Sequence, residues 1–461
     1  MLLILGSCQK DPFIQASVEM IEADYPGGDF EFSLQSNSAW HISLAYPPGG
    51  ERYWAHVETS SGEKGTTVIK IHVDPSTQYS REANIVISSE DAPDYYQSIA
   101  LWQQGKLDCN LYPRLSKDFA EFLAKMVFSE WGIVLYKDIL NIKVLNLEGK
   151  VFKDWSDLAY LENLEELDIS GCNLSDLDFL QHPKLRVLRC SDNSISQLDL
   201  SKFPELEELW CWNNQIKKID ISSLDKLYTL YCSGNPLEEL VLNTMLANLS
   251  CSGCNLETLD LSGTTRLRDL DCSQNRIEYL NLANTKAYII NCDNNPLKTL
   301  LLPDPDIIEV LSCKKCELTG SLTVGKRIVQ LDCQDNQLEQ LVFRSAGELN
   351  ELNCQNNRLQ ELTILDSPRM SRINCSGNRL TSVHLGEMGY LVDINCTGNL
   401  LQGLELPGAL RIEYVSVQGN PGHEGTFELK VPEATWLYDF VDNWDWEGQP
   451  VKVSWTFLPW N

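Results

Sequence analysis

The chain has 461 residues, and its 65 acidic and 37 basic side chains give a formal net charge of −28 at pH 7. Such an excess of negative charge opposes binding to nucleic acid, or to an anionic membrane surface, through phosphate groups. No stretch approaches the roughly 18 consecutive apolar residues of a membrane-spanning helix. We therefore expect neither a nucleic-acid partner nor a membrane span, and the acidity suits an extracytoplasmic protein that must stay soluble.

The N-terminus is a short apolar run that ends in Leu5, Gly6, Ser7 and Cys8. This ending resembles the lipobox of bacterial lipoproteins, which implies cleavage before Cys8 and attachment of lipid to its sulfur. The run is shorter than a usual signal peptide and lacks a basic start, so the alternatives are a start codon further upstream and an accidental apolar N-terminus. We expect residues 1–8 to be the remnant of a lipoprotein signal and Cys8 to carry the only attachment to a membrane.

The three residues that follow Cys8 are Gln9, Lys10 and Asp11. They resemble the short charged signals that carry some lipoproteins of Bacteroidetes to the outer face of the outer membrane. The resemblance implies an outer-membrane lipoprotein that is exposed on the cell surface.

Residues 9–106 contain runs in which apolar and polar residues alternate, separated by turns rich in Gly, Pro and Ser. Examples are residues 29–34, 67–73 and 83–88. Alternation with a period of two places one face of a strand in a core and the other in water. Several such strands predict an antiparallel β-sandwich as the first domain of a β-rich, multidomain chain.

Four short motifs mark the same segment: Ser38-Ala39-Trp40 followed by Trp54, Ser60-Ser61-Gly62, Arg81 with Ala83-Asn84-Ile85, and Gln103-Gln104-Gly105. Together they resemble the BACON domain, an immunoglobulin-like module of Bacteroidetes often found N-terminal to carbohydrate-active proteins. The segment departs from that pattern in an insertion at residues 91–96. The resemblance implies a carbohydrate context, and a simple spacer is the alternative. Trp40 and Trp54 lie within strand-like pattern, so we expect them in the core rather than on a sugar platform.

Residues 107–140 are expected to form a linker and an N-terminal cap. Apolar residues follow helical spacing from Leu115 to Val127, and Ser116 is available as the N-cap. Related repeat proteins often carry a calcium loop at the position of residues 128–135, which here lack the aspartates that a calcium site needs. We therefore expect an amphipathic helix that covers the first coil of the repeats, and no bound metal.

A tandem repeat fills the centre of the chain, and its clearest mark is a cysteine that recurs every 19 to 21 residues. The eleven positions are Cys190, Cys211, Cys232, Cys251, Cys272, Cys292, Cys313, Cys333, Cys354, Cys375 and Cys396. Each cysteine stands in the frame L-x-x-L-x-C-x-x-N-x-L-x-x-L-x-L. A period near 20 in this frame resembles leucine-rich repeats, in the cysteine-ladder form of internalin-like proteins. The resemblance implies a solenoid with a parallel β-sheet on its concave face.

The frame has a physical explanation that one repeat illustrates. Leu209 and Cys211 are two residues apart, so they share the inward face of a short strand, while Trp210 points outward. Stacked coils pair such strands in parallel at about 4.8 Å, and no single coil can cover its own apolar side. Only an array of coils buries a continuous core.

Three residues after most ladder positions comes an asparagine, whose amide can satisfy the backbone groups of a turn. These residues are Asn193, Asn214, Asn235, Asn275, Asn295, Asn336, Asn357, Asn378, Asn399 and Asn420. A thiol takes the same place at Cys172, Cys254 and Cys316. The ladder itself extends to Leu147, Ile169 and Val417, which gives 11 + 3 = 14 coils over residues 141–422.

Two cysteine pairs, Cys251/Cys254 and Cys313/Cys316, have the CxxC spacing of zinc or redox motifs. The repeat frame alone produces this spacing, because it assigns the first cysteine of each pair to the core and the second to the turn. We expect free thiols that pack as small apolar groups. A disulfide between neighbouring coils is the alternative, since adjacent strands lie within the distance that such a bond tolerates.

Residues 423–461 are expected to cap the far end of the solenoid, because exposed core there would aggregate. This segment is rich in tryptophan, with Trp436, Trp444, Trp446, Trp455 and Trp460.

The outward strand positions form the expected binding surface, and two regions of it stand out. The first is aromatic and consists of Trp210, Trp212 and Tyr231. Exposed aromatic rings anchor protein interfaces and stack on sugars, unless another element covers them or they only pack on each other. The second region is polar and includes Asp269, Asp271, Asn291, Asp332 and Asn353. Its side chains could bind sugar hydroxyls or basic groups of a partner, or form a solvated face.

The sequence shows no arrangement typical of an enzyme. Its six histidines are scattered and form no HExxH motif, and no Gly-rich phosphate loop occurs. Asp269 and Asp271 imitate a glycosidase pair in spacing, but strand carboxylates without a cleft are more often surface charge. We expect a monomeric, non-enzymatic protein without a cofactor, whose concave face binds a protein ligand. The alternatives are an accessory protein that binds a carbohydrate or mucin glycan, and a structural adhesion component.

Overall fold

The computed structural model describes residues 13–76, 78–128, 132–424, 426–432 and 452–456. It divides into two compact units. The N-terminal unit comprises residues 1–143 and 152–163, and the solenoid unit comprises residues 144–151 and 164–461. The expected lipobox at Cys8 lies outside the described residues. Among the helices that are described, none is both long enough and apolar enough to cross a membrane.

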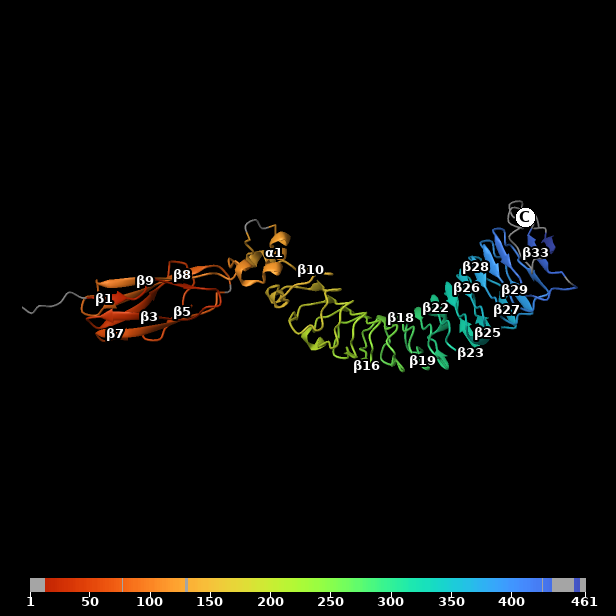
Figure 1. The fold of residues 1–461 in the computed structure, drawn as a ribbon, viewed down its shortest axis with the longest axis horizontal. Helices are drawn as coiled ribbons and strands as arrows, with labels where there is room; N and C mark the ends of the chain where they lie inside the picture. Colours follow the sequence, from red (N-terminus) through yellow and green to blue (C-terminus); the bar gives the residue numbers. More distant parts are fainter. Residues whose placement is uncertain (1–12, 77, 129–131, 425, 433–451, 457–461) are drawn as a thin grey trace, which may run out of the picture. The chain divides into compact units, whose positions relative to one another are not determined.

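Two β-sheets share one core in the N-terminal unit (Figure 1). Their strand orders are β1-β3-β7-β5 and β2-β9-β8-β4-β6. The strands are β1 (Ile14–Ala16), β2 (Met20–Ala23), β3 (Gly28–Ser36), β4 (Trp40–Ala45), β5 (Ala55–Val57), β6 (Ser61–Gly62), β7 (Gly65–Val73), β8 (Arg81–Ser89) and β9 (Tyr96–Gln103). Neighbouring strands run antiparallel, as the alternation predicts, except that β2 runs parallel to β9.

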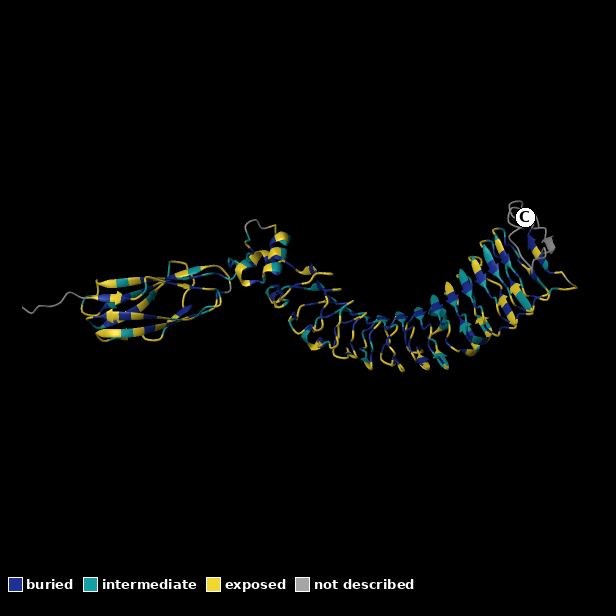
Figure 2. Ribbon diagram, in the orientation of Figure 1, coloured by how far each residue is buried: buried dark blue, intermediate teal, exposed yellow. Residues whose placement is uncertain are grey.

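Buried and exposed bands alternate along these strands (Figure 2), because each strand presents one face to the shared core. Trp40 and Trp54 are among the buried residues, so the expectation that they are core aromatics is confirmed. The same positions are therefore not open platforms for a sugar.

The carboxamide of Gln103 holds together the segments that meet at the end of β9. Its Nε2 donates to the carbonyl oxygens of Asp74 (2.9 Å) and Asp24 (3.1 Å), and its Oε1 accepts from Nε of Arg81 (2.8 Å). The guanidinium of Arg81 in turn lies 4.5 Å from the ring centroid of Trp54. Because Gln103 is fully buried, its carboxamide depends on these partners for its hydrogen bonds.

We expect Gln103→Ala to destabilise the N-terminal unit by about 2–3 kcal/mol, because two carbonyl oxygens and one guanidinium N–H lose a buried partner. Urea unfolding of the full chain measures the effect. Gln104→Ala is the matched control, since its side chain makes a 3.3 Å bond to the carbonyl oxygen of Asp108 and is only partly buried. Equal losses for the two variants would contradict the assignment.

Short helices follow the sheets: η1 (Tyr112–Arg114), α1 (Lys117–Met126) and α2 (Tyr136–Ile139). Ser116 occupies the N-cap position of α1, but its hydroxyl makes no capping bond to the helix. It instead donates to Oδ2 of Asp157 at 2.6 Å, within η2 (Ser156–Tyr160). The predicted N-cap position of Ser116 is thus confirmed, but its hydroxyl bonds to the buried carboxylate of Asp157, a stronger acceptor, and does not cap the helix. The inward face of α1 packs through Phe119, whose ring meets Phe152 edge-on at 5.2 Å.

A parallel sheet of 14 strands runs the length of the solenoid unit and lines the concave side of its arc (Figure 1). In order the strands are β10 (Val144–Asn146), β11 (Glu166–Asp168), β12 (Val187–Arg189), β13 (Glu208–Trp210), β15 (Thr229–Tyr231), β17 (Asn248–Ser250), β18 (Asp269–Asp271), β20 (Ile289–Asn291), β22 (Val310–Ser312), β24 (Gln330–Asp332), β26 (Glu351–Asn353), β28 (Arg372–Asn374), β30 (Asp393–Asn395) and β32 (Tyr414–Ser416). Their number equals the number of ladder positions in the sequence. Leu209 and Cys211 are fully buried and Trp210 is partly exposed, as the frame predicts.

The asparagines of the frame connect each coil to both of its neighbours. Nδ2 of Asn275 donates to the carbonyl oxygens of Cys251 (2.9 Å) in the preceding coil, and of Cys272 (3.0 Å) and Ser273 (3.1 Å) in its own. Its Oδ1 accepts from the backbone N–H groups of Cys254 and Leu256, both at 3.0 Å. The predicted role of the asparagine in the turn is confirmed. Where a thiol replaces it, as in Cys316, Sγ donates to the carbonyl oxygen of Cys292 at 3.1 Å.

The convex side carries additional short strands that the sequence frame did not predict (Figure 1). They pair as β14 (Lys218–Asp220) with β16 (Glu239–Val241), β19 (Tyr279–Asn281) with β21 (Thr299–Leu301), β23 (Thr319–Val324) with β25 (Gln337–Phe343), β27 (Glu361–Ile364) with β29 (Ser382–Leu385), and β31 (Gly403–Glu405) with β33 (Glu428–Pro432). The coil at residues 255–262 contributes no strand to this side. Convex pairing is therefore interrupted, whereas the concave sheet is continuous.

Single turns of 3-10 helix occur in two coils, at η3 (Leu200–Lys202) and η4 (Pro305–Ile307). At the C-terminal end, β33 pairs with β34 (Lys452–Thr456). Most of the expected cap, including Trp436, Trp444, Trp446 and Trp460, lies outside the described residues.

Candidate binding surface

The concave sheet aligns one outward side chain from each coil after the first in a single row. Its register places them in the order Asp168, Arg189, Trp210, Tyr231, Ser250, Asp271, Asn291, Ser312, Asp332, Asn353, Asn374, Asn395 and Ser416. All of them are partly exposed. The row is thus a continuous surface on which neighbouring side chains come from residues about 20 positions apart in the sequence.

The three predicted aromatic residues form one cluster in this surface. The ring of Trp210 lies 5.5 Å from that of Trp212 and 5.3 Å from that of Tyr231, measured between centroids. All three rings keep partial exposure, so packing against one another does not bury them. We call Trp210, Trp212 and Tyr231 the aromatic cluster.

Two charged side chains contact the Trp210 ring of the aromatic cluster. The guanidinium of Arg189 lies 4.8 Å from the ring centroid of Trp210, and Nε1 of Trp210 donates to Oε2 of Glu208 at 3.3 Å. Oε1 of Glu208 accepts from the hydroxyl of Tyr228 at 2.8 Å. A cation stacked on an indole is attracted by the ring's electron-rich face, so this side of the cluster already has a basic partner.

On its other side, the aromatic cluster borders a hollow of about 350 Å³. The hollow is lined by Trp212, Tyr231, Ser233, Leu249, Ser250, Asp269 and Asp271. Two of the predicted polar residues, Asp269 and Asp271, therefore lie across this hollow from the aromatic cluster. In the sequence, the aromatic and the polar regions were considered separately. In the structure, residues of both regions line the same hollow.

Further along the row, Asn291 lies close to a carboxylate whose hydrogen bonds are all made within the solenoid. The neighbouring Asp293 is buried, and its Oδ1 accepts from the hydroxyl of Ser312 (2.7 Å) and the backbone N–H of Lys314 (2.8 Å). Nζ of Lys314 lies 3.1 Å from the other carboxylate oxygen. The positive charge of Lys314 is thus committed to an ion pair within the solenoid.

The remaining predicted residues, Asp332 and Asn353, lie in another hollow, of about 470 Å³, toward the C-terminal coils. Burial raises the pKa of the Asp332 carboxyl, although a 3.2 Å bond from Nε2 of Gln334 opposes the shift. The amides of Gln334 and Gln355 bond to each other, and Asn374 donates to Gln355 at 2.9 Å. The amide side chains of this part of the surface therefore bond to one another along the row.

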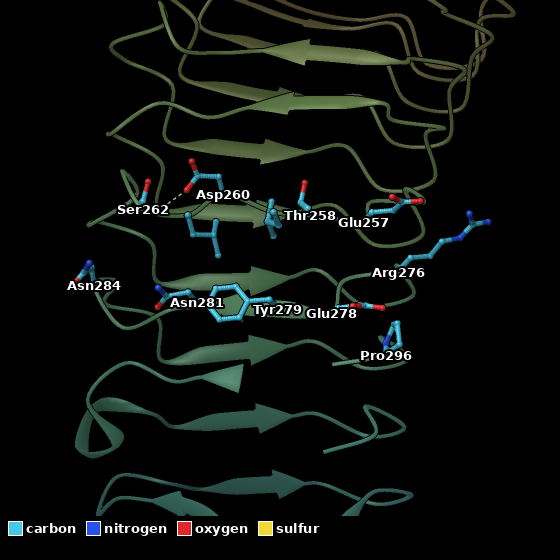
Figure 3. A pocket seen from close by; sticks show the side chains of 12 residues that line it. Glu257, Thr258, Asp260, Ser262, Arg276, Glu278, Tyr279, Asn281, Asn284 and Pro296 are labelled. Atoms are coloured by element: carbon cyan, nitrogen blue, oxygen red, sulfur yellow. Dashed lines mark hydrogen bonds between the residues drawn. The ribbon is translucent and has the colours of Figure 1, made fainter. Parts of the chain in front are cut away.

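A larger hollow, of about 910 Å³, lies on the convex side, beside the coil at residues 255–262 that contributes no strand there. Figure 3 shows Tyr279 next to Asn281, with Asp260 and Ser262 on the adjacent coil. Tyr279 is 54% exposed, which makes it an accessible aromatic ring among amide and carboxylate groups. The sequence frame gave no signal for this hollow, because it arises from an interruption in strand pairing.

Burial disfavours the reactive thiolate form of the ladder cysteine Cys190. The described cysteines are buried and free, and burial raises the pKa of the Cys190 thiol to about 12. A thiol that stays protonated is neither a nucleophile nor a metal ligand. Among the described residues, no cluster of three or more His, Cys, Asp or Glu side chains could hold a metal ion.

Comparison with known proteins identifies the repeats. Residues 162–202, 183–218 and 204–243 match the family of leucine-rich repeats, in its two-copy description. The chain contains leucine-rich repeats. A search among curated protein sequences finds no match.

Solved leucine-rich repeat structures share the solenoid fold. The functional domain of InlJ from Listeria monocytogenes, which includes a cysteine ladder, is 20% identical in sequence, with a TM-score of 0.53. The similarity covers 68% of this chain and 79% of that domain. YopM, a leucine-rich effector protein from Yersinia pestis, is 20% identical over 68% of this chain and 88% of its own, with a TM-score of 0.45. The likeness to InlJ shows that the predicted leucine-rich repeat solenoid is correct as a fold.

Proposed function

We propose that the chain is a non-enzymatic binding protein whose concave leucine-rich repeat surface holds a protein partner. The observation that carries this proposal is the continuous row of partly exposed side chains along the 14-stranded sheet. Thirteen strand spacings of about 4.8 Å give this surface a length of roughly 62 Å. A surface of that length suits an extended macromolecule, and concave solenoid faces are the usual binding surfaces of repeat proteins.

The aromatic cluster supports a protein as the partner. Tryptophan and tyrosine are enriched among the residues that dominate the binding energy of protein interfaces. Trp210, Trp212 and Tyr231 combine partial exposure with mutual packing, so they offer apolar area at little cost in side-chain entropy.

The proposal includes a place for the protein at the bacterial cell surface. The lipobox-like ending at Cys8 supports an outer-membrane lipoprotein, with the N-terminal unit as the BACON-like spacer between the lipid and the solenoid. Mass spectrometry of the native protein tests this part, because a lipoprotein carries a diacylglyceryl group on Cys8. A native Cys8 without lipid would reject the anchor and leave the binding proposal untouched.

The binding proposal predicts that the double variant Trp210→Ala/Trp212→Ala loses its protein partner. A screen of the soluble full chain against extracellular proteins and a polysaccharide array identifies the ligand. Removing two anchor residues of an interface is expected to weaken binding at least a hundredfold. Tyr279→Ala, which removes an exposed ring from the convex side, is the matched control and is expected to bind normally.

A glycan is the second candidate ligand, and the convex hollow is the specific observation that favours it. Tyr279 gives an open aromatic face beside Asn281 and Asp260, the combination of stacking and hydrogen bonding that sugars use. Under this alternative the polysaccharide array gives the hit, and Tyr279→Ala loses it while the tryptophan double variant does not. The two variants therefore separate the candidates.

A further inference from the structure

The hollow beside the aromatic cluster has a shape that follows from the register of three strands. Tyr231, Ser250 and Asp271 occupy the same row on consecutive strands β15, β17 and β18. The small serine in the middle leaves a gap about 10 Å wide, two strand spacings, between a ring and a carboxylate. The hydroxyls of Ser250 and Ser233 bond to each other at 2.8 Å and form a polar floor.

Asp269 is the unusual member of this hollow. It is partly buried, and no hydrogen bond or ion pair engages its carboxylate within the described part of the chain. The pKa of this carboxyl is raised by burial first and then by the nearby charge of Asp271. A partly buried anion without a counter-charge is unfavourable in the free protein, so a cation at this point would be bound with a gain in free energy.

The other carboxylates near the hollow are already engaged, which makes Asp269 distinct. Oδ1 of Asp271 accepts from the backbone N–H (3.0 Å) and the hydroxyl (2.7 Å) of Ser273, and these bonds fix its orientation. Asp293, in the next coil, has Lys314 as its partner. The basic residue nearest along the row on the opposite side, Arg189, lies over Trp210. The hollow thus combines one free carboxylate and one fixed carboxylate.

The aromatic wall completes a receptor for a planar cation. Rings of Trp212 and Tyr231 line the side opposite the carboxylates. A guanidinium is flat, stacks on aromatic faces and can donate several parallel N–H bonds to carboxylate oxygens, whereas an ammonium is a compact and strongly hydrated charge. Arg189 over Trp210 shows the same stacking within this surface.

We propose that the hollow between Trp212, Tyr231, Asp269 and Asp271 receives the guanidinium of an arginine side chain on the protein partner. This inference rests on the proposed function, because it gives the concave surface a protein ligand and names the chemistry of one of its anchors. It goes further in assigning recognition to Asp269, which a purely aromatic interface would not require.

A capped peptide, acetyl-Gly-Arg-Gly-amide, tests the hollow without the natural partner. The full chain is labelled with 5-fluorotryptophan, and the fluorine resonance of Trp212 is assigned with Trp212→Phe. We expect the arginine peptide to shift this resonance saturably, and the peptide with neutral, isosteric citrulline to leave it in place. Asp269→Asn is expected to weaken arginine binding about tenfold, because it removes a charge-assisted hydrogen bond.

Two further variants keep the test independent of folding. Asp225→Asn, at an exposed turn of the same solenoid, is the matched control and is expected to bind normally. Ser250→Tyr extends the aromatic row into the gap and is expected to abolish the shift. The melting temperature of Asp269→Asn should equal or exceed that of the unmodified chain, because the substitution removes an unpaired anion.

The inference is overturned if citrulline binds as well as arginine, if Asp269→Asn binds unchanged, or if a lysine peptide binds more tightly than the arginine peptide. Failure here is distinct from failure of the proposed function. A protein partner that is lost in the tryptophan double variant but retained by Asp269→Asn would overturn the arginine site alone. Binding of the arginine peptide, with only a glycan hit in the screen, would overturn the protein partner alone.

Discussion

Replacing Asn275 by alanine is expected to lower the free energy of unfolding of the solenoid by about 4 kcal/mol. The side chain is buried and makes five hydrogen bonds to the backbone, three as donor and two as acceptor. Each buried backbone group that loses its partner costs about 1–3 kcal/mol, and relaxation of the turn recovers part of the sum. Urea unfolding followed by circular dichroism measures the loss.

Two variants show whether the loss comes from those bonds. Asn284→Ala removes an exposed asparagine from the same solenoid and is expected to change stability by less than about 0.5 kcal/mol. Asn275→Cys should be intermediate, because the chain itself uses a thiol at this place in Cys316, where Sγ donates to two carbonyl oxygens. A cysteine variant as unstable as the alanine variant would show that the thiol is not a substitute for the amide.

Replacing Gly386 by alanine is expected to destabilise the solenoid by about 3 kcal/mol or more. A Cβ atom at this position would lie 1.9 Å from the carbonyl oxygen of Leu365 in the preceding coil. The backbone N–H of Gly386 also donates to the carbonyl oxygen of Ile364 at 2.8 Å, so the two coils are held in contact here. Because the obstructing atom belongs to the backbone, the clash is relieved only by moving a coil.

Gly263→Ala is the control for this prediction. Its new Cβ would come no closer than 4.0 Å to any neighbouring atom outside its own local segment, and the nearest of those atoms belongs to the side chain of Thr244. Thermal unfolding of the two alanine variants is expected to show a clear fall in Tm for Gly386→Ala and little change for Gly263→Ala. Similar values would mean that the coils can separate on the convex side without loss of stability.

The concave sheet was predictable from the sequence because its positions repeat with fixed roles. Leu209 and Cys211 are buried and Trp210 is partly exposed, as alternation requires, and asparagines that follow ladder positions, such as Asn214, bond to their turns. Because the same frame recurs in every coil, a wrong assignment of inward and outward positions in one coil would have appeared as a break in the period. The fold of the solenoid follows from this redundancy.

The convex strands and the hollow of Figure 3 were not predictable in the same way. Residues 216–221 and 256–261 have similar apolar spacing, yet only the first segment contains a strand. The difference depends on whether the neighbouring coil also presents an extended segment, which a single repeat cannot reveal. In the N-terminal unit, the parallel pairing of β2 with β9 and the bond from Ser116 to Asp157 likewise depend on partners distant in sequence.

The residues of the candidate site were predicted from the sequence, but the hydrogen-bond partners of its carboxylates were not. The sequence selected Trp212, Tyr231, Asp269 and Asp271 from their outward positions, and the register brings them around one hollow. Which carboxylate has a partner depends on neighbours such as Ser273, whose hydroxyl reaches Asp271 and not Asp269. That distinction requires coordinates, since both aspartates occupy equivalent outward places in the repeat frame.

The interrupted pairing on the convex side gives the solenoid an uneven stiffness against bending. Each pair of convex strands, such as β14 with β16, is held by hydrogen bonds between two coils, and the segments between the pairs lack this strand pairing. We expect bending of the solenoid to concentrate in those segments, because the concave sheet is hydrogen-bonded along its whole length. Under the proposed function, such bending would allow one concave surface to fit protein partners of somewhat different curvature.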